Sequence, residues 1–351
     1  MILFAIVAAI GLMVGCGVGG IIRVEPNARL SRGEKKAMPR LWAALTQRGT
    51  DACGFSYEDG GTAYTLKTPG SAKVKSHLMQ RNLKRGIRWM MMHTRAATTG
   101  KPEDNRNNHP LRHGNILGIH NGWFTGWRHV FNRLGWKRHE AGTEVDSEAA
   151  LACIAREGLA AVSKRLGGPA TLIWTDITDT QALRLWTNGG SPLWFAKTHN
   201  GNILFASTKG ILVQACKNII ADGPWEAEDC MEYVGDVAGL TPLKTVGTTY
   251  EFATNYGGFD WDDDWWKEYP APKKMTPKRK QLATSGSKGA SGAVVIDDRG
   301  MRWELTEKGN WKNVEAIGKT GTITRLKAEP PRKKVINKMT DEEWWDSQED
   351  Y

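Results

Sequence analysis

Apolar and polar residues recur along roughly the first 250 positions with the two periods that distinguish strands from helices. Short apolar runs bounded by turn residues are typical of strands, and apolar residues three and four positions apart are typical of amphipathic helices. Strands are predicted at 54–57, 87–92, 116–119, 170–175, 182–187, 192–197 and 203–207. Helices are predicted at 35–47, 72–86 and 147–165. This pattern indicates an α+β protein.

The first 22 residues contain no charged side chain and are almost wholly apolar. A run of this length can span a bilayer, but it lacks the basic start of a secretory signal. Met13-Val14-Gly15-Cys16 resembles a lipoprotein cleavage box that also lacks a positive start. We expect residues 1–15 to be a leader or propeptide that is removed. A membrane anchor, a lipoprotein and a retained extension are the alternatives.

Positive charge is concentrated near the C-terminus. The whole chain has a net charge of +10, and residues 271–338 alone hold 17 Lys and Arg against 6 Asp and Glu, a balance of +11. The rest of the chain is therefore close to neutral. This regional bias indicates a partner for the C-terminal region, either a protein or, through residues 271–338, nucleic acid.

The C-terminal region divides into three parts. Residues 255–292 hold Asp262-Asp263-Asp264-Trp265-Trp266 and a basic linker, and residues 329–351 hold Asp341-Glu342-Glu343-Trp344-Trp345. We interpret each acidic Trp motif as a docking motif or as a segment that folds back onto the basic surface. Four short β runs, at 293–296, 302–305, 311–314 and 321–326, predict a small β module at 293–328 that resembles an SH3-like barrel. A solvated appendage that binds nothing nucleic is the alternative for this module.

The stretch from His93 to Gly122 holds the most informative chemistry. It begins with His93-Thr94-Arg95 and ends on His120-Asn121-Gly122, directly after an apolar run that predicts a strand. At the end of such a strand, the Asn amide and the Gly N–H are suited to stabilise negative charge on a carbonyl oxygen. A plain Asn-Gly hairpin turn is the alternative reading.

Five motifs in order resemble the glutamine-binding core of class II glutamine amidotransferases. They are Cys16-Gly17, Arg48-Gly49-Thr50-Asp51-Ala52-Cys53-Gly54, the HTRAATTGKP segment that starts at His93 with the NNHP that follows it, His120-Asn121-Gly122, and Val145-Asp146-Ser147-Glu148. The resemblance implies an N-terminal nucleophile (Ntn) hydrolase fold, a four-layer αββα sandwich, at residues 16–254. The small C-terminal β module would be additional to that fold.

The resemblance implies that Cys16 is the nucleophile. In an Ntn enzyme, the α-amine of the first residue activates the thiol, and its pKa near 7.7–8.0 suits that role. An amide nitrogen in mid-chain cannot act as this base, so activity depends on exposing Cys16 as the N-terminus. Asn121 and Gly122 would form the oxyanion hole. A small buried hydrophobe is the alternative reading of Cys16.

The remaining site residues are also implied by the resemblance. Arg95 would bind the α-carboxylate of glutamine with its planar fork of donors, Thr98 would add a polar contact, and Asp146 would bind the α-amino group. Arg48 would hold the loop of the nucleophile. Surface salt bridges or a surface Arg are the alternatives for these charged residues, and an N-cap is the alternative for Asp146.

The sequence departs from the family at two positions. Ala96 and Thr99 stand where the glucosamine-synthesising branch has Trp and His, and the motif looks closer to free-standing amidotransferase-like proteins. Some of those proteins hydrolyse other γ-glutamyl amides, so the expected substrate is glutamine or a γ-glutamyl amide.

We expect a cytoplasmic glutamine amidotransferase without a metal or cofactor. The five cysteines are scattered and show no zinc-like spacing. The roughly 100 residues after position 254 are too few and too polar for an ammonia-accepting synthase, so ammonia would pass to a protein partner or to solvent. The alternative function is an inactive scaffold of the same fold that binds protein or nucleic acid through its basic C-terminal module.

Overall fold

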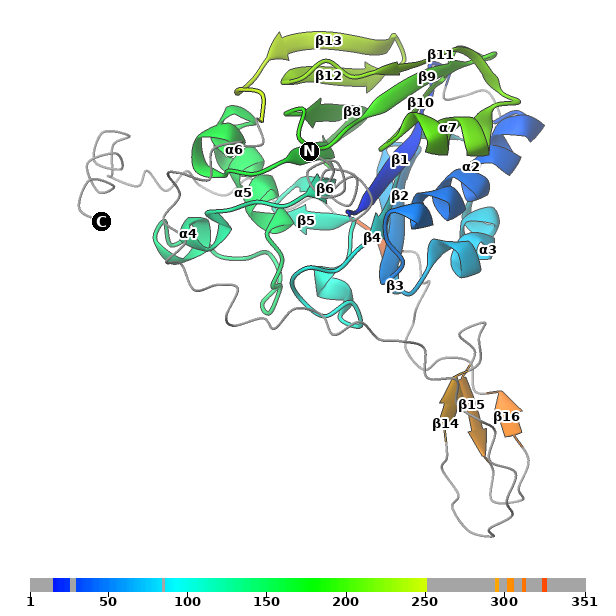
Figure 1. The fold of residues 1–351 in the computed structure, drawn as a ribbon, viewed down its shortest axis with the longest axis horizontal. Helices are drawn as coiled ribbons and strands as arrows, with labels where there is room; N and C mark the ends of the chain where they lie inside the picture. The colour runs from blue at the N-terminus through cyan, green and yellow to red at the C-terminus, as the bar shows by residue number, and fades with distance from the viewer. Residues whose placement is uncertain are drawn as a thin grey trace, which may run out of the picture.

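The protein is described by a computed structural model that covers residues 15–25, 30–83, 86–250, 294–296, 302–305, 311–313 and 324–326. Two antiparallel sheets face each other at the centre of the molecule (Figure 1). The predicted leader at 1–15 lies outside the described residues except for Gly15, and both acidic Trp motifs lie outside them completely. No helix in the described ranges is long and apolar enough to cross a membrane.

The first sheet has eight strands and carries the expected nucleophile at its centre. Its order is β11 (Ile220–Glu226), β9 (Trp194–Thr198), β10 (Ile203–Ala206), β1 (Gly17–Ile22), β4 (Ile87–Arg95), β2 (Ala52–Asp59), β3 (Thr62–Pro69) and β17 (Thr324–Arg325). Strand β1 pairs with β10 on one side and with β4 on the other, with Gly17 opposite Thr94. Cys16 therefore precedes a central strand and lies next to the end of β4.

The second sheet has six strands. Its order is β13 (Gly239–Thr245), β12 (Met231–Asp236), β8 (Asp179–Thr187), β7 (Ala170–Asp176), β6 (Ile116–Gly122) and β5 (Leu111–His113). Strand β6 pairs with β7 along its whole length, with Asn121 opposite Thr171. Because Asn121 and Gly122 end this strand, the sheet fixes where their polar groups lie.

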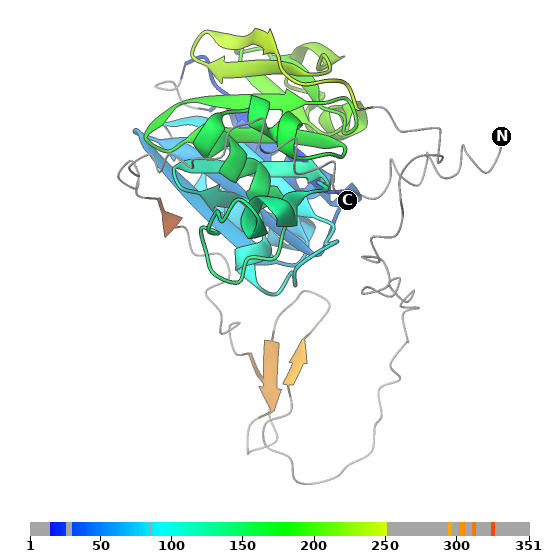
Figure 2. The same ribbon diagram turned by 90° about the vertical axis from the view of Figure 1, so that its left-hand side faces the viewer.

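Three apolar layers hold the sheets and helices together. The layer between the sheets includes the fully buried Trp89 and Phe205. The outer face of the first sheet packs against α2 (Arg32–Ala44), α3 (Ala72–Asn82) and α7 (Lys209–Cys216), with the short 3-10 helix η1 (Leu45–Gln47) following α2. The outer face of the second sheet packs against α5 (Ser147–Glu157) and α6 (Ala160–Arg165), beside α4 (Trp127–Asn132). Figure 1 shows these layers edge-on, from α4, α5 and α6 on the left to α2, α3 and α7 on the right, and Figure 2 looks onto them with the green helices in front of the sheets. The layers confirm the four-layer αββα sandwich.

The helix expected at 147–165 is two helices. Gly158, at φ 89°, follows the last residue of α5, and α6 begins two residues later. A residue in this left-handed region ends a helix, and glycine adopts it without steric cost. The apolar pattern continues across the break because both helices pack on the same sheet.

The expected β module is also divided. Strands β14 (Val294–Ile296), β15 (Arg302–Leu305) and β16 (Trp311–Asn313) form a separate three-stranded antiparallel sheet. The strand expected at 321–326 instead contributes β17 to the large sheet, where Thr324 pairs with Thr65 and Arg325 with Tyr64. Strand β3 lies at the edge of the β2–β3 hairpin, and an open edge offers unpaired N–H and C=O groups to such a segment. Leu326 then donates its N–H to Ala63 O at 3.0 Å and packs against the inter-sheet layer.

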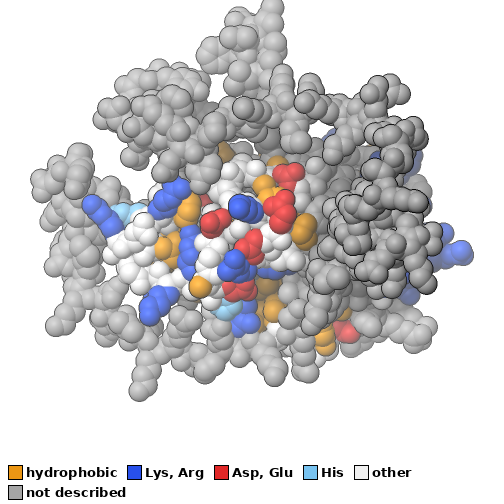
Figure 3. Space-filling model, turned by 90° about the horizontal axis from the view of Figure 1, so that it is seen from below, with side chains coloured by type: hydrophobic (Ala, Val, Ile, Leu, Met, Phe, Trp, Pro, Cys, Tyr) orange, Lys and Arg blue, Asp and Glu red, His pale blue; other side chains and the backbone are white. Residues whose placement is uncertain are grey.

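Charges on the face seen in Figure 3 are mixed. Acidic and basic side chains lie next to one another there without a patch of a single sign.

Replacing Phe205 with Ala tests the inter-sheet layer. Phe205 is fully buried between the sheets, so Phe205→Ala should lower the free energy of unfolding by about 3–5 kcal/mol. The measurement is urea denaturation followed by circular dichroism. Val213→Ala on α7, where the side chain is 37% exposed, is the control and should change stability by less than about 0.5 kcal/mol. Equal effects of the two variants would contradict this account of the core.

Candidate active site

Cys16 lies where the two sheets bring three motifs together. Its Sγ is 3.7 Å from Ala96 O, just after the end of β4. Its carbonyl oxygen accepts a hydrogen bond from Arg48 Nε at 3.3 Å. A Cβ placed on the preceding Gly15 would lie 2.8 Å from Arg48 Nη2 and 3.3 Å from Asn121 Oδ1. The structure thus brings Cys16, Arg48 and Asn121 next to one another.

The Cys16 thiol is strongly perturbed. Burial raises its pKa from 9.0 to about 11, and the Asp146 carboxylate acts in the same direction. A backbone hydrogen bond with Ala96 and the charges of Arg95 and Arg48 oppose this rise in pKa without cancelling it. With Gly15 attached, the thiol is therefore protonated at neutral pH, and the nitrogen of Cys16 is an amide.

Asn121 is buried with its polar atoms unused. Its side chain is 1% exposed, and neither Nδ2 nor Oδ1 has a hydrogen-bond partner within the described part of the chain. A buried amide without partners is costly, so such a group is typical of a site that completes its hydrogen bonds with a ligand. Gly122 follows at φ 129°, where an added Cβ would lie 1.9 Å from Pro169 O, so only glycine fits this backbone.

Arg95 is held by the loop that follows it. Its guanidinium donates from Nη1 to Asn108 Oδ1 at 2.9 Å and from Nη2 to Thr99 O and to Gly100 O, the last at 2.9 Å. These bonds use three of the five N–H donors of the side chain. Burial lowers the pKa of Arg95, and the charges of Cys16, Asp51 and Asp146 raise it. The charge of Arg95 therefore interacts with both Cys16 and Asp146.

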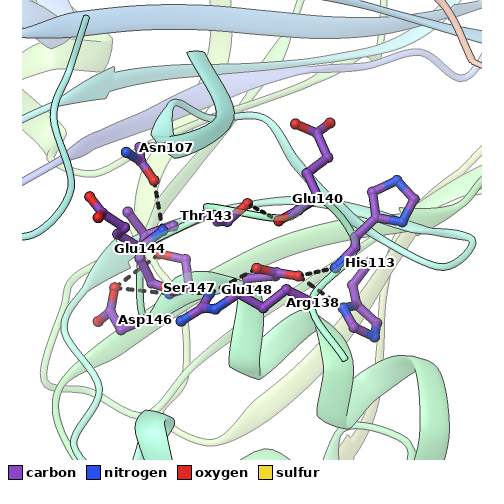
Figure 4. Close-up of polar contacts among 11 residues, drawn as sticks. Asn107, His113, Arg138, Glu140, Thr143, Glu144, Asp146, Ser147 and Glu148 are labelled. Atoms are coloured by element: carbon purple, nitrogen blue, oxygen red, sulfur yellow. Dashed lines mark hydrogen bonds and ion pairs between the residues drawn. The ribbon is translucent and has the colours of Figure 1, made fainter. Parts of the chain in front are cut away.

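Asp146 begins α5 and accepts hydrogen bonds on both carboxylate oxygens. Oδ1 accepts from Ser147 N at 2.8 Å, and Oδ2 accepts from Phe124 N at 2.6 Å. Figure 4 shows Asp146 beside Ser147 and Glu148. The Glu148 carboxylate is a separate group, which bonds Arg138 Nη1 at 2.9 Å and His113 Nδ1 at 3.2 Å. Asp146 is thus the N-cap residue, and its charge also acts on Cys16 and Arg95.

Thr98 is the one expected site residue that the structure leaves apart. Its side chain is exposed, and no polar contact of its hydroxyl occurs among the described residues. The loop around it is fixed instead by Asp51, whose Oδ2 accepts a hydrogen bond from Ala97 N at 2.8 Å. The described ranges contain no group of three or more His, Cys, Asp or Glu side chains arranged to hold a metal ion.

Comparison with known proteins shows what this chain is similar to. Residues 93–214 match the family described as a glutamine amidotransferase domain. The chain is 28% identical over 224 residues to a glutamine–fructose-6-phosphate aminotransferase (isomerizing) of Rhizobium meliloti strain 1021, which covers 60% of this chain and 34% of the relative. The chain thus resembles glutamine amidotransferases over residues 93–214. The match includes Arg95, Asn121, Gly122 and Asp146 within its bounds.

Two further proteins are similar to this chain. An enzyme of the same name from Sulfurisphaera tokodaii is 28% identical over 135 residues, which covers 38% of this chain and 22% of that protein. The solved structure of a glutamine phosphoribosylpyrophosphate amidotransferase from B. subtilis has a TM-score of 0.51 and 17% identity, and covers 66% of this chain and 49% of that chain. This second likeness shows the fold. The chain spans about a third of the length of the Rhizobium relative it matches.

Several residues that support the candidate site had no role assigned from the sequence. Asn108 holds Arg95, and Gly49 lies so close to the end of β4 that an added Cβ would be 2.3 Å from Arg95 C. His93 Nε2 bonds His120 O at 3.0 Å across the two sheets. Each lies inside a motif, but its role depends on a contact with a distant segment, which spacing alone does not reveal.

Gly49→Ala tests the close approach of the Arg48 loop to the end of β4. The new methyl group would overlap main-chain atoms of residues 95 and 96, so unfolding free energy should fall by about 1–3 kcal/mol. Gly210→Ala in α7 is the control, because its nearest atom would be 4.0 Å away and alanine favours helices. Urea denaturation of both variants checks the prediction. No loss of stability in Gly49→Ala would contradict it.

Alkylation of the full chain tests the state of the thiol. With a pKa of about 11, roughly one Cys16 in a thousand is a thiolate at pH 8. Iodoacetamide should therefore modify Cys16 about a hundred times more slowly than free cysteine at pH 8, and the rate should rise up to about pH 11. Peptide mass spectrometry measures the modified fraction, and Cys16→Ala gives the background from the four buried cysteines. Labelling as fast as that of free cysteine would contradict the prediction.

Proposed function

We propose that this protein hydrolyses the side-chain amide of glutamine, or of a related γ-glutamyl amide, with Cys16 as nucleophile. The observation that carries the proposal is the Asn121 amide, which is buried beside Gly15 and Cys16 with both polar atoms unused among the described residues. An amide held in this way is suited to bind the oxyanion that forms when a thiol attacks a carbonyl.

The proposed reaction begins with the removal of residues 1–15. The freed α-amine of Cys16 takes the thiol proton as Sγ attacks the side-chain carbonyl carbon of glutamine. The carbonyl oxygen becomes an oxyanion that accepts hydrogen bonds from Asn121 Nδ2 and from the Gly122 N–H. The α-ammonium then gives its proton to the leaving nitrogen, the C–N bond breaks, and ammonia and a thioester form.

The second half of the reaction releases glutamate. A water molecule gives one proton to the α-amine as its oxygen attacks the thioester carbon. The same oxyanion contacts stabilise the second tetrahedral intermediate. Collapse breaks the C–S bond, the sulfur regains a proton from the α-ammonium, and the enzyme returns to its starting state.

Substrate recognition in this proposal uses two charges. Arg95 retains donors beyond its three bonds to the loop, and these bind the α-carboxylate of the substrate. Asp146 binds the α-amino group, because its oxygens accept further hydrogen bonds in the directions that Ser147 and Phe124 leave open. Electrostatic coupling of Cys16 with both Arg95 and Asp146 supports a substrate that spans all three.

The destination of the ammonia is part of the proposal. The relatives are named as an aminotransferase and an amidotransferase, and this chain matches a third to a half of their length. We propose that ammonia passes to a separate protein partner or to solvent. The basic region at 271–338 supports a partner with an acidic surface more directly than it supports nucleic acid.

A second candidate function is a scaffold without catalysis. The raised pKa of Cys16 and its amide nitrogen, when Gly15 is attached, favour an inactive site. The protein would then act through its C-terminal partner surface. Retention of residues 1–15 in the mature protein is the condition for this candidate.

Ammonia release tests the proposed function. A chain made to begin at Cys16 should release ammonia from glutamine, and the same chain with Gly15 retained should not. Cys16→Ala should lower the rate by roughly three orders of magnitude or more, whereas Cys216→Ala, in α7 on the outer face of the first sheet, should leave it unchanged. A coupled glutamate dehydrogenase assay measures the product. Full activity in Cys16→Ala would reject the proposal.

A further inference from the structure

A closed ring of contacts surrounds Asn121 and Gly122. The His120 ring stacks on the Phe124 ring, with centroids 4.5 Å apart and planes 14° from parallel. Phe124 N donates to Asp146 Oδ2 at 2.6 Å, and Asp146 is followed in the chain by Ser147. Ser147 Oγ lies 2.9 Å from His120 Nδ1, which closes the ring. The two expected oxyanion donors lie on the segment that this ring spans, between His120 and Phe124.

The hydrogen positions in this ring follow from the acceptors around it. The Asp146 carboxylate accepts only, and its Oδ1 lies 3.4 Å from Ser147 Oγ, so the Ser147 hydroxyl points its hydrogen at Asp146. The hydroxyl oxygen then accepts from His120 Nδ1–H. Burial lowers the pKa of His120 to about 4, so at neutral pH the ring carries this one proton and Nε2 is a lone pair. Within the described ranges Nε2 has no partner, which costs less for an acceptor than for an N–H.

His93 adds a second constraint on the same residue. Its Nε2 is 3.0 Å from His120 O, and because a carbonyl only accepts, His93 carries its proton on Nε2. His93 is fully buried in β4 of the first sheet, whereas His120 belongs to β6 of the second. The main chain just before Asn121 is therefore held by His93 of the first sheet, and the ring of His120 is held by Ser147 of α5.

We propose that His120 and Ser147 are positioning residues which lock the oxyanion segment to Asp146 through the relay His120 Nδ1–H to Ser147 Oγ–H to Asp146 Oδ1. This inference rests on the proposed function for its catalytic meaning. Through the relay, the group that binds the α-amino end of the substrate and the group that binds the oxyanion move as one unit. Loss of the Ser147 hydroxyl should therefore weaken substrate binding and turnover together, although Ser147 itself touches neither reacting atom.

The ring has parts that can be removed separately. Ser147→Ala removes the hydroxyl at a position where alanine suits the first turn of a helix, and Ser147→Thr restores it. Phe124→Leu removes the ring stack while the Phe124 main-chain N–H to Asp146 remains. Ser76→Ala is a matched control, because among the described residues the Ser76 hydroxyl bonds only Lys73 O, at 3.4 Å and one turn earlier in α3.

Calorimetry of the full chain with glutamine measures binding without any need for a free α-amine. Ser147→Ala should bind glutamine about five- to thirty-fold more weakly than the wild type, as expected for a lost hydrogen bond to a charged group. Ser147→Thr should restore affinity to within about threefold, and Ser76→Ala should match the wild type. Unchanged affinity in Ser147→Ala would overturn the proposal.

The kinetics of glutamine hydrolysis by the form that begins at Cys16 distinguish a positioning role of Ser147 from a role in stability alone. Ser147→Ala should lower kcat and raise KM together, by about tenfold in kcat/KM or more. In an Asn121→Ala background, the same change should lower kcat by less than about twofold, because the group that the relay positions is gone. Equal losses in both backgrounds would overturn the link to the oxyanion segment.

Nitrogen-15 NMR of the imidazole rings in the full chain shows which ring nitrogens carry the protons that the relay requires. This test applies even where a variant fails to fold or the wild type does not turn over glutamine. The wild type should show the His120 proton on Nδ1 and the His93 proton on Nε2. A proton on His120 Nε2 overturns the proposal. If the wild type binds no glutamine and releases no ammonia, the proposed function fails, whereas the NMR result still accepts or rejects the relay.

Discussion

Together with the hydrogen bond from Trp89 Nε1 to Thr180 O at 2.8 Å, the hydrogen bond from His93 to the main chain of His120 connects the two sheets. The layer between the sheets is apolar, and apolar contacts set distance but not register. A buried hydrogen bond has a strict direction and length, so this contact fixes how far β6 slides along β4. Cys16 directly precedes β1 and Arg95 ends β4 in the first sheet, whereas Asn121 lies in β6 of the second, so the geometry of the site depends on that register.

Most of the architecture followed from the sequence. The pattern located β4, β6 and the four strands from β7 to β10, because apolar runs between turn residues reflect burial directly. Strands β11 and β13 escaped it, since their residues are mostly exposed and leave no apolar pattern. The break at Gly158 and the place of β17 depend on a backbone angle and on an open sheet edge, and neither changes the periodicity.

The candidate site was likewise predicted from the sequence only in part. The motifs identified the charges and the amide that a glutamine site requires, and the structure brings Cys16, Arg48 and Asn121 together with Arg95 and Asp146 in electrostatic reach. What the motifs did not reveal is that Arg95 is already engaged by Asn108 and by two loop carbonyls. Such contacts join residues in a folded loop, and their partners are chosen by loop shape, which a linear spacing does not specify. Thr98 was implied by the resemblance alone and lies exposed.

Strand β17 attaches the chain after residue 323 to the first sheet, so the preceding segment is not a tail with one free end. Tyr250 N bonds Asn188 O at 2.7 Å, and Thr324 pairs with Thr65, so the 73 residues from 251 to 323 are anchored to the sandwich at both ends. Closing a loop of that length costs about 4 kcal/mol of chain entropy, which the β17 pairing and the packing of Leu326 must offset. A double anchor keeps the three-stranded sheet at a high local concentration beside the sandwich. After a single proteolytic cut within the loop, the described contacts that hold the C-terminal fragment on the body would be those of β17 and Leu326.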